Sequence, residues 1–174
     1  NNEVVLITGA GGSIGSELSK QIIKLKPLKL ILFDNSEHSL YQIERKISEM
    51  RISCEIVCVL GSILNSKLLE KIHRQHGITM MFHAAAYKHV PLVEKNITQG
   101  VSNNILGTLC LVEFAEKCLI KRFTLISTDK AVRPTNIMGA SKRFAEMLAQ
   151  SANDTSSVTN FCMVRFGNVL NSSG

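Results

Sequence analysis

A glycine-rich turn separates the first apolar run of the chain from the first amphipathic one, and this order constrains the fold more than any other feature. Residues 3–8 have the apolar character of a buried strand, and residues 13–25 have the periodicity of a helix. Gly9, Gly12 and Gly15 lie in the turn and at the helix start. In such a unit, backbone N–H groups and the helix N-terminus can approach a pyrophosphate. The start of the chain therefore predicts a dinucleotide-binding βαβ unit, with a purely structural glycine turn as the alternative.

Five more apolar runs alternate with helical patterns along the remaining sequence. We expect strands at residues 28–34, 54–60, 80–85, 122–127 and 159–166, and helices at residues 36–50, 66–76, about 98–118 and 136–152. The runs are apolar throughout, which is typical of strands covered on both faces. The sequence therefore predicts an α/β fold with a doubly wound parallel sheet of six strands ordered 3-2-1-4-5-6. Residues 1–174 are expected to form one NAD-binding Rossmann domain.

The charge and cysteine content narrow the class of protein. The net charge of +6 fits a basic solvated surface or attraction to an anionic ligand, and the basic residues form no dense run of the kind that nucleic-acid binding needs. The five cysteines lack Cys-x-x-Cys spacing and lie in apolar contexts, so we expect buried, reduced thiols and no metal site. No apolar run is long enough to span a bilayer. These features predict a cytoplasmic protein that binds no nucleic acid and makes no membrane contact through this segment.

Both ends of the sequence look cut. The chain begins at Asn1 without a methionine, and it ends at Gly174 just past the last predicted strand. We therefore expect a segment of a longer protein. The longer protein could be anchored to the inner face of a membrane, and it could form a homo-oligomer.

An acidic residue ends the second predicted strand. Asp34 lies nineteen residues after Gly15, where a carboxylate can bind the adenosine ribose hydroxyls. The same carboxylate would repel a 2′-phosphate, so Asp34 predicts NAD rather than NADP as the cofactor. Asn35 and Ser36 can add ribose contacts, whereas Ser62, after the third strand, either meets the adenine or caps the next helix.

Six strings spread over nearly the whole chain carry a resemblance to a known family. They are TGAGGSIG at 8–15, HAAAYKHVP at 83–91, NILGT at 104–108, STDKAVRP at 127–134, MGASK at 138–142 and RFGNV at 165–169. The chain resembles the extended short-chain dehydrogenase/reductase superfamily, and within it the CapD-like polysaccharide-biosynthesis branch of UDP-N-acetylglucosamine 4,6-dehydratases. The combination of Thr-Asp-Lys with Met-x-x-x-Lys is specific to this branch. Two positions depart from the family pattern: Ser62, where many relatives carry Asp, and Asn171, where Gly is usual.

The resemblance implies a complete NAD site. Its parts would be the glycine turn, the end of the second strand, the turn after the third strand and small residues around the nicotinamide. Asn104 matches a family residue that supports the active-site helix. The expected cofactor-binding residues are Thr8, Gly9, Gly12, Ser13, Ile14, Gly15, Asp34, Asn35, Ser36, Ser62, Ile63, Ala84, Ala85, Ala86, Asn104, Ser127 and Lys142.

The motif that usually carries catalysis in this superfamily is altered. Met138 stands where Tyr-x-x-x-Lys would place its tyrosine, and Lys142 keeps its position. A Tyr and a Lys four residues apart share one helix face, where the ammonium lowers the phenol pKa so that the phenolate can take a proton. A thioether cannot do this. Met138 is therefore expected to pack the substrate pocket and Lys142 to bind the nicotinamide ribose. The group that accepts the proton of the substrate hydroxyl being oxidised stays open.

A second acid/base pair precedes this motif. The resemblance implies that hydride leaves C4 of a hexose for NAD, that water is lost across C5 and C6, and that the hydride returns to C6. Thr128 would contact the 4-hydroxyl, Asp129 would protonate the departing 6-hydroxyl, and Lys130 would take the C5 proton. A surface ion pair is the alternative for Asp129 and Lys130. The pair follows a strand of a parallel sheet, at the edge where ligands bind in this fold, which favours catalysis.

The resemblance also implies a UDP-sugar substrate for the longer protein, whose C-terminal substrate-binding part is absent from this segment. Lys88 and His89, on the loop after the fourth strand, either meet this substrate or stay solvated, and Asn168 matches a residue that binds the diphosphate. Two other functions stay open, a nucleotide-sugar 4-epimerase and a dinucleotide-binding regulatory module without turnover. Asp129 and Lys130 favour the dehydratase, an NAD-dependent lyase for surface polysaccharide or glycan biosynthesis, because an epimerase needs no acid for a leaving 6-hydroxyl.

Overall fold

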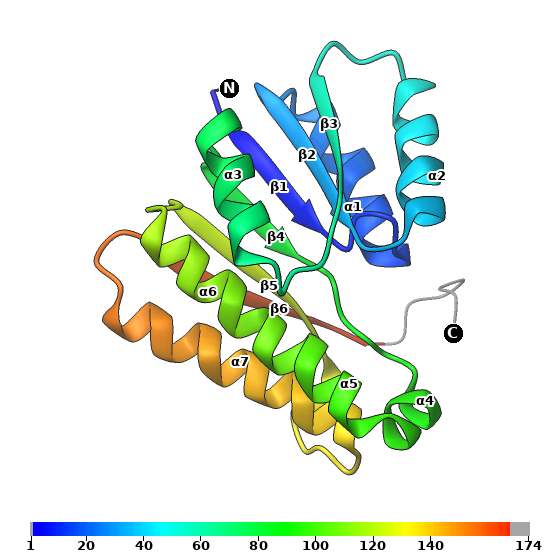
Figure 1. The fold of residues 1–174 in the computed structure, drawn as a ribbon, viewed down its shortest axis with the longest axis vertical. Helices are drawn as coiled ribbons and strands as arrows, with labels where there is room; N and C mark the ends of the chain where they lie inside the picture. Colours follow the sequence, from blue (N-terminus) through cyan, green and yellow to red (C-terminus); the bar gives the residue numbers. More distant parts are fainter. Residues whose placement is uncertain (1, 168–174) are drawn as a thin grey trace.

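The computed structural model describes residues 2–167, which form one parallel sheet of six strands (Figure 1). The strands are β1 Val4–Thr8, β2 Lys29–Asp34, β3 Glu55–Leu60, β4 Met80–His83, β5 Arg122–Thr128 and β6 Asn160–Phe166. Their order is β3-β2-β1-β4-β5-β6, and every neighbouring pair is parallel. The predicted doubly wound fold and its strand order are therefore confirmed.

Helices cover both faces of this sheet (Figure 1). The main helices are α1 Ser13–Lys24, α2 Glu37–Ser48, α3 Ser66–His76, α6 Gly107–Lys117 and α7 Ile137–Thr155. Side chains of α1 and α2 pack on one face, and side chains of α3, α6 and α7 pack on the other. Successive strand residues point to opposite faces, so Leu6 and Ile7 belong to different hydrophobic clusters. Within residues 2–167, no helix combines the length and the apolar sequence that crossing a bilayer requires.

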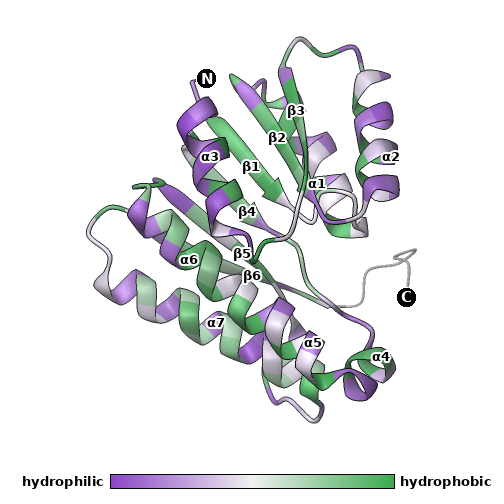
Figure 2. Ribbon diagram, viewed as in Figure 1, coloured by the Kyte–Doolittle hydropathy of each residue, from purple (hydrophilic) through white to green (hydrophobic). Residues whose placement is uncertain are grey.

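The central strands form a fully buried core. Leu6, Ile7 and Leu32 have no exposed surface. Figure 2 shows β1 as a nearly continuous hydrophobic ribbon, whereas the helices carry hydrophilic stretches. Truncating a buried leucine of this kind to alanine typically costs about 2–5 kcal/mol of stability. This core fixes the carboxyl ends of the strands, where the loops of the candidate site meet.

The structure differs from the sequence prediction between β4 and β5. β4 ends at His83, and the segment around Pro91, expected as a loop, contains the short helix α4 Val90–Lys95. Proline fits the first turn of a helix because its missing N–H needs no partner there. The helix expected at residues 98–118 is made of α5 Ile97–Val101, the π-helical turn η1 Ser102–Leu106 and α6. Amphipathic periodicity does not report the extra residue of a π turn, so the sequence missed it.

The cysteines are less buried than the sequence predicted. All five are free thiols, but Cys162 is exposed and the other four are half-buried. Cys162 lies on β6, which is an edge strand of the sheet and is exposed at most of its positions. The prediction of burial was therefore wrong for Cys162, because an apolar context along the sequence does not reveal which strand lies at the edge.

Candidate active site

Two adjacent pockets open at the carboxyl edge of the sheet, and they share Ala84, Ala86 and Tyr87 on the loop after β4. The loop pocket, about 180 Å³, lies beside the glycine turn and the end of β2. The reaction pocket, about 220 Å³, lies between the ends of β5 and β6 and the start of α7. The loop pocket is also lined by Gly9, Gly12, Phe33, Asp34, Asn35, Ser39, Gly61, Ile63, Ala85 and Asn103. The reaction pocket is also lined by Ile14, Lys88, His89, Ile126, Ser127, Thr128, Lys130, Met138, Lys142, Phe166 and Gly167.

The glycine turn is packed too tightly for a side chain at three of its positions, Gly9, Gly11 and Gly15. Gly9 has a left-handed backbone with a φ of 67°, and a Cβ there would lie 2.6 Å from the Ala85 nitrogen. A Cβ on Gly15 would overlap the Gly9 carbonyl oxygen. α1 begins directly after Gly12 and opens with Ser13. The turn therefore brings the N-terminus of α1 and bare backbone to the pockets, which is the arrangement that a pyrophosphate requires.

Asp34 ties the end of β2 to this turn. One carboxylate oxygen accepts a hydrogen bond from the Gly11 N–H, and the other accepts one from the Ser36 N–H, both at 2.9 Å. Asp34 is almost buried and lines the loop pocket beside the exposed Asn35. Ser36 caps α2 by accepting the Ser39 N–H. A carboxylate offers about four acceptor sites, so the Asp34 carboxylate keeps acceptor capacity for ribose hydroxyls.

Ser62 has a local role in the turn after β3. Its hydroxyl is exposed and accepts the Leu64 N–H at 3.3 Å. The cap of α3 is Asn65, whose side chain accepts the Leu68 N–H, so the suggestion that Ser62 caps this helix was wrong. The loop pocket is lined at this turn by its two neighbours, Gly61 and Ile63.

Thr8 lies in a buried hydrogen-bond chain and lines neither pocket. Its hydroxyl lies 2.9 Å from Nδ1 of His83, and Nε2 of the same ring lies 3.1 Å from the Thr108 hydroxyl. Thr108 donates to the Asn104 carbonyl, so it accepts from Nε2–H, and Nδ1 then accepts from Thr8. Burial, together with the nearby Lys142 charge, lowers the pKa of His83 to about 3. The chain thus holds a neutral imidazole beneath the site, which the sequence analysis missed.

Asn104 connects the loop after β4 to α7. Its side-chain oxygen accepts the Tyr87 N–H at 2.8 Å, and its amide nitrogen donates to the Tyr87 carbonyl and to the Ser141 hydroxyl, both at 3.0 Å. Ser141 in turn donates to the Met138 carbonyl. Asn104 is buried in the π turn η1, and its neighbour Asn103 is the residue that lines the loop pocket. The π turn therefore holds Asn104 against α7, while the preceding Asn103 lines the loop pocket.

Lys142 and Met138 form the helical wall of the reaction pocket. Lys142 is buried and donates to the Ile126 carbonyl at 2.7 Å. Burial lowers the pKa of Lys142 to about 8, and the Glu146 carboxylate partly opposes this shift. Met138 is also buried. A Cβ on the adjacent Gly139 would lie 2.6 Å from the Lys130 carbonyl oxygen, so glycine lets α7 begin against the segment after β5.

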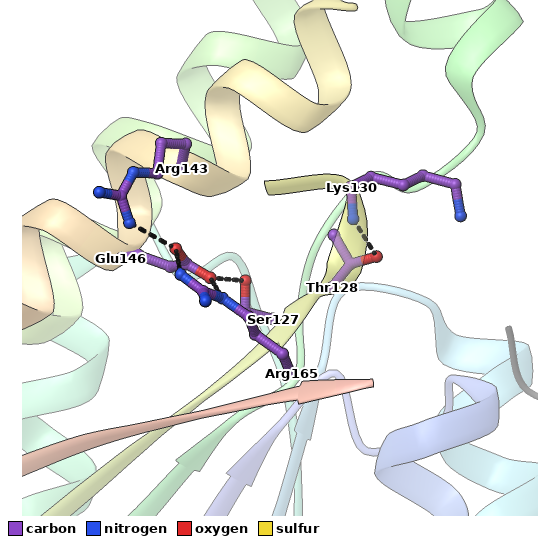
Figure 3. Close-up of polar contacts among 6 residues, drawn as sticks. All are labelled: Ser127, Thr128, Lys130, Arg143, Glu146 and Arg165. Atoms are coloured by element: carbon purple, nitrogen blue, oxygen red, sulfur yellow. Dashed lines mark hydrogen bonds and ion pairs between the residues drawn. The ribbon is translucent and has the colours of Figure 1, made fainter. Parts of the chain in front are cut away.

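Asp129 and Lys130, the predicted acid and base, lie just past the end of β5 in the 3₁₀ turn η2 Asp129–Ala131. The Thr128 hydroxyl donates to the Asp129 carboxylate at 3.0 Å. It also accepts the Lys130 N–H at 3.4 Å (Figure 3). Lys130 and Thr128 line the reaction pocket, and Asp129 lies exposed between them along the chain. The structure thus brings Thr128, Lys130, Met138 and Lys142 to one pocket, with the Asp129 carboxylate at its rim.

Residues 5–174 match the family described as polysaccharide biosynthesis protein. This chain belongs to the polysaccharide biosynthesis protein family. The capsular polysaccharide biosynthesis protein CapD of Staphylococcus aureus is 46% identical over 176 residues, which cover 99% of this chain and 29% of CapD. The inverting UDP-N-acetylglucosamine 4,6-dehydratase of Campylobacter jejuni is 30% identical and covers 100% of this chain and 51% of that enzyme. UDP-glucose 4-epimerases of Rickettsia are also similar, at 32% identity.

The fold of this family member is shared with a solved structure. The X-ray structure of Pen from Bacillus thuringiensis matches with a TM-score of 0.90 and 33% identity, over 100% of this chain and 53% of Pen. The chain therefore spans about half the length, or less, of the relatives that it matches. The resemblance to nucleotide-sugar enzymes of the extended short-chain dehydrogenase/reductase superfamily is confirmed, with both dehydratases and epimerases among the relatives.

Some site residues of this polysaccharide biosynthesis family member were predicted from the sequence, whereas others were missed. Lys88 and His89 are exposed and line the reaction pocket, and Tyr87, which the sequence analysis did not single out, lines both pockets. Asn168 lies outside the described residues. The fully buried Glu146 was also missed, although it lies one helical turn after Lys142 on the same face of α7.

Proposed function

We propose that the chain is the NAD-binding half of a nucleotide-sugar 4,6-dehydratase, an NAD-dependent lyase acting on UDP-N-acetylglucosamine in surface polysaccharide or glycan biosynthesis. The observation that carries this proposal is the composition of the reaction pocket. Lys130 and Lys142 line it, Asp129 adjoins it, and Met138 takes the helical position of the usual tyrosine. This set offers proton donors and acceptors for removing a hydroxyl group, which an epimerase does not need.

The residues of the two pockets fit NAD. The bare backbone at Gly9 and Gly15 suits a pyrophosphate, and the Asp34 carboxylate keeps acceptor sites for the ribose. The shared Ala84, Ala86 and Tyr87 join the two pockets, so that a dinucleotide can extend from one into the other. When bound, NAD supplies a reversible acceptor for the C4 hydride.

The side chains of the chain handle the protons and the orientation of the sugar. Thr128 is placed to hydrogen-bond the 4-hydroxyl, and Lys142 to hydrogen-bond the nicotinamide ribose. Lys130 takes the C5 proton, which a 4-keto group makes acidic, and Asp129 protonates the hydroxyl that leaves C6. A proton returns to C5 as hydride returns to C6. The proton released when the 4-hydroxyl is oxidised balances the one that Asp129 gives to the leaving hydroxyl, so the net change is the loss of one water molecule. Lys88 and His89 at the pocket mouth supply donors for the phosphates of the sugar nucleotide.

A nucleotide-sugar 4-epimerase is the second candidate, because UDP-glucose 4-epimerases of Rickettsia are as similar to this chain as the named dehydratase. Both reactions begin with oxidation at C4, and they differ in whether water is lost. NMR of the full-length protein with UDP-N-acetylglucosamine distinguishes them. A 4-keto-6-deoxy sugar supports the dehydratase, a C4 epimer supports the epimerase, and an unchanged substrate supports a regulatory module.

NAD is expected to bind more tightly than NADP, because Asp34 would repel a 2′-phosphate. Asp34→Asn keeps the size of the side chain and one acceptor oxygen but removes the charge. This variant should lose roughly tenfold to a hundredfold in NAD affinity, as charged hydrogen bonds contribute about 1.5–3 kcal/mol, and it should discriminate less against NADP. Isothermal titration calorimetry measures both affinities.

Glu37→Gln is the matched control for Asp34→Asn. It removes a carboxylate three residues further on, from the exposed first turn of α2. NAD affinity should be unchanged in this variant. Tighter binding of NADP than of NAD by the unmodified protein would contradict the role given to Asp34.

A further inference from the structure

The Glu146 carboxylate is fully buried beside the reaction pocket and accepts four hydrogen bonds. One oxygen accepts from the Ser127 hydroxyl at 2.7 Å and from Nε of Arg165 at 2.8 Å. The other accepts from an Arg165 terminal nitrogen at 2.7 Å and from Arg143 at 3.1 Å (Figure 3). Although burial acts to raise the pKa of Glu146, hydrogen bonds from Arg165, Ser127 and Arg143 hold it at about 2. The carboxylate is therefore charged at any working pH.

These contacts join three elements at one point. Glu146 belongs to α7, and Ser127 and Arg165 are register partners at the ends of β5 and β6. One turn earlier on α7, Lys142 bonds the carbonyl of Ile126, the residue before Ser127. Lys142 and Glu146, on one helix face, therefore hydrogen-bond consecutive residues of β5. Because Arg165 contacts both carboxylate oxygens, the end of β6 is fixed in direction as well as in distance.

Each strand residue that bonds Glu146 directly precedes a residue that lines the reaction pocket. Thr128 follows Ser127 and lines the reaction pocket, and Phe166 follows Arg165 and lines the same pocket. Ser127 itself lines the pocket and commits its hydroxyl proton to Glu146, which fixes the direction in which its remaining acceptor sites point. Only the Glu146 side chain of these ion pairs is buried, since the Arg165 side chain is 39% exposed, and an apolar residue of similar volume often serves as well as a buried charge. The cluster therefore calls for a second role.

We propose that Glu146 is a positioning residue for the reaction pocket, which orients the Ser127 hydroxyl and holds the ends of β5 and β6 against α7, so that Thr128 and Lys142 stay in one pocket. The expected effect of Glu146 on turnover rests on the dehydratase function proposed above. Small displacements of reacting groups reduce rates steeply, by roughly a hundredfold for 1 Å, whereas affinity for substrate depends on many contacts. Loss of the Glu146 contacts should therefore lower kcat much more than it changes KM.

The test compares Glu146→Gln with Arg143→Gln in the full-length protein. Arg143 is a matched control because it also bonds Glu146 and is about as exposed as Arg165, but it lies on the same helix at i−3 and holds neither strand. Glu146→Gln should reduce kcat at least roughly tenfold, change KM less than about threefold, and speed amide exchange at Thr128 and Phe166. Arg143→Gln should match the unmodified protein in all three.

A double variant separates positioning from general weakening of the fold. If Glu146 acts through Ser127, then Glu146→Gln combined with Ser127→Ala should be no slower than Glu146→Gln alone. Arg165→Lys keeps the positive charge but loses the two-point contact, so it should show the same changes in kcat and amide exchange in a milder form. If Glu146→Gln does not fold, Arg165→Lys takes its place in the test. Unchanged amide exchange at Thr128 in these variants, or effects of Glu146→Gln and Ser127→Ala that multiply, would overturn the inference. Absence of turnover in the unmodified protein would instead reject the dehydratase function, and the exchange measurement would still decide the role of Glu146.

Discussion

Replacing Asp129 by Asn or Lys130 by Ala in the full-length protein is expected to reduce dehydration at least roughly a hundredfold while NAD binding persists. Asn cannot give a proton to the departing 6-hydroxyl, and Ala cannot take one from C5. Neither residue lines the loop pocket, where the adenosine half of NAD is proposed to lie. Product formation measured by NMR and NAD affinity measured by calorimetry separate the two effects.

Two controls match these substitutions. Lys121→Ala removes an exposed lysine just before β5, at the opposite end of the strand that leads to Lys130. Asp154→Asn removes an exposed carboxylate near the end of α7, far along the helix from the pocket. Both should leave turnover within about twofold of the unmodified protein, since surface substitutions rarely matter. Near-normal turnover of Asp129→Asn or Lys130→Ala would remove the acid/base assignment.

Lys142→Met is expected to reduce turnover at least roughly a hundredfold and to leave the protein at least as stable at pH 7. Burial holds the pKa of Lys142 near 8, below the value of about 10.4 in an unfolded chain. Between these values the unfolded chain binds a proton that the folded chain lacks. The contribution of Lys142 to the free energy of unfolding therefore rises as pH increases through this window, by up to about 3 kcal/mol. The methionine variant should lack this rise.

Urea unfolding at pH 7 and at pH 10 measures this difference. Lys46→Met, on the exposed side of α2, is the control and should keep the pH dependence of the unmodified protein. A Lys142→Met protein that is clearly less stable at pH 7 and that keeps the full pH dependence would show that Lys142 is a structural residue. Turnover of Lys142→Met should fall while its stability at pH 7 does not. A general loss of folding would lower both, so it cannot produce this result.

The fold was predictable because its signals are local in the sequence. Each central strand is a continuous apolar run, the glycine turn follows the first of them, and Asp34 ends the second. The π turn around Asn104 and the short helix α4 left no comparable signal. In the same way, an apolar context predicted burial of Cys162 but did not reveal that β6 is an edge strand.

The site was predictable only in part, since several of its contacts join distant segments. The motif around Lys142 and the pair at Asp129, interpreted through the resemblance to a family, pointed to residues that the structure brings to the reaction pocket or beside it. Thr8 was expected at the cofactor, but its hydroxyl bonds His83, which lies 75 residues away in the sequence. The role of Glu146 depends on Arg165 and Ser127, each nineteen residues away on strands that only the folded sheet brings to α7. A Lys-x-x-x-Glu spacing on one helix face was the available signal, and it does not by itself name the partners.

A 4,6-dehydratase transfers the C4 hydrogen to C6 within one substrate molecule, whereas a 4-epimerase returns it to C4. The most direct test is NMR of the product formed by the full-length protein from UDP-N-acetylglucosamine deuterated at C4. The dehydratase account predicts a 4-keto-6-deoxy sugar that carries the deuterium at C6, with NAD unchanged in amount. A C4 epimer, or a substrate that is returned unaltered, would contradict it.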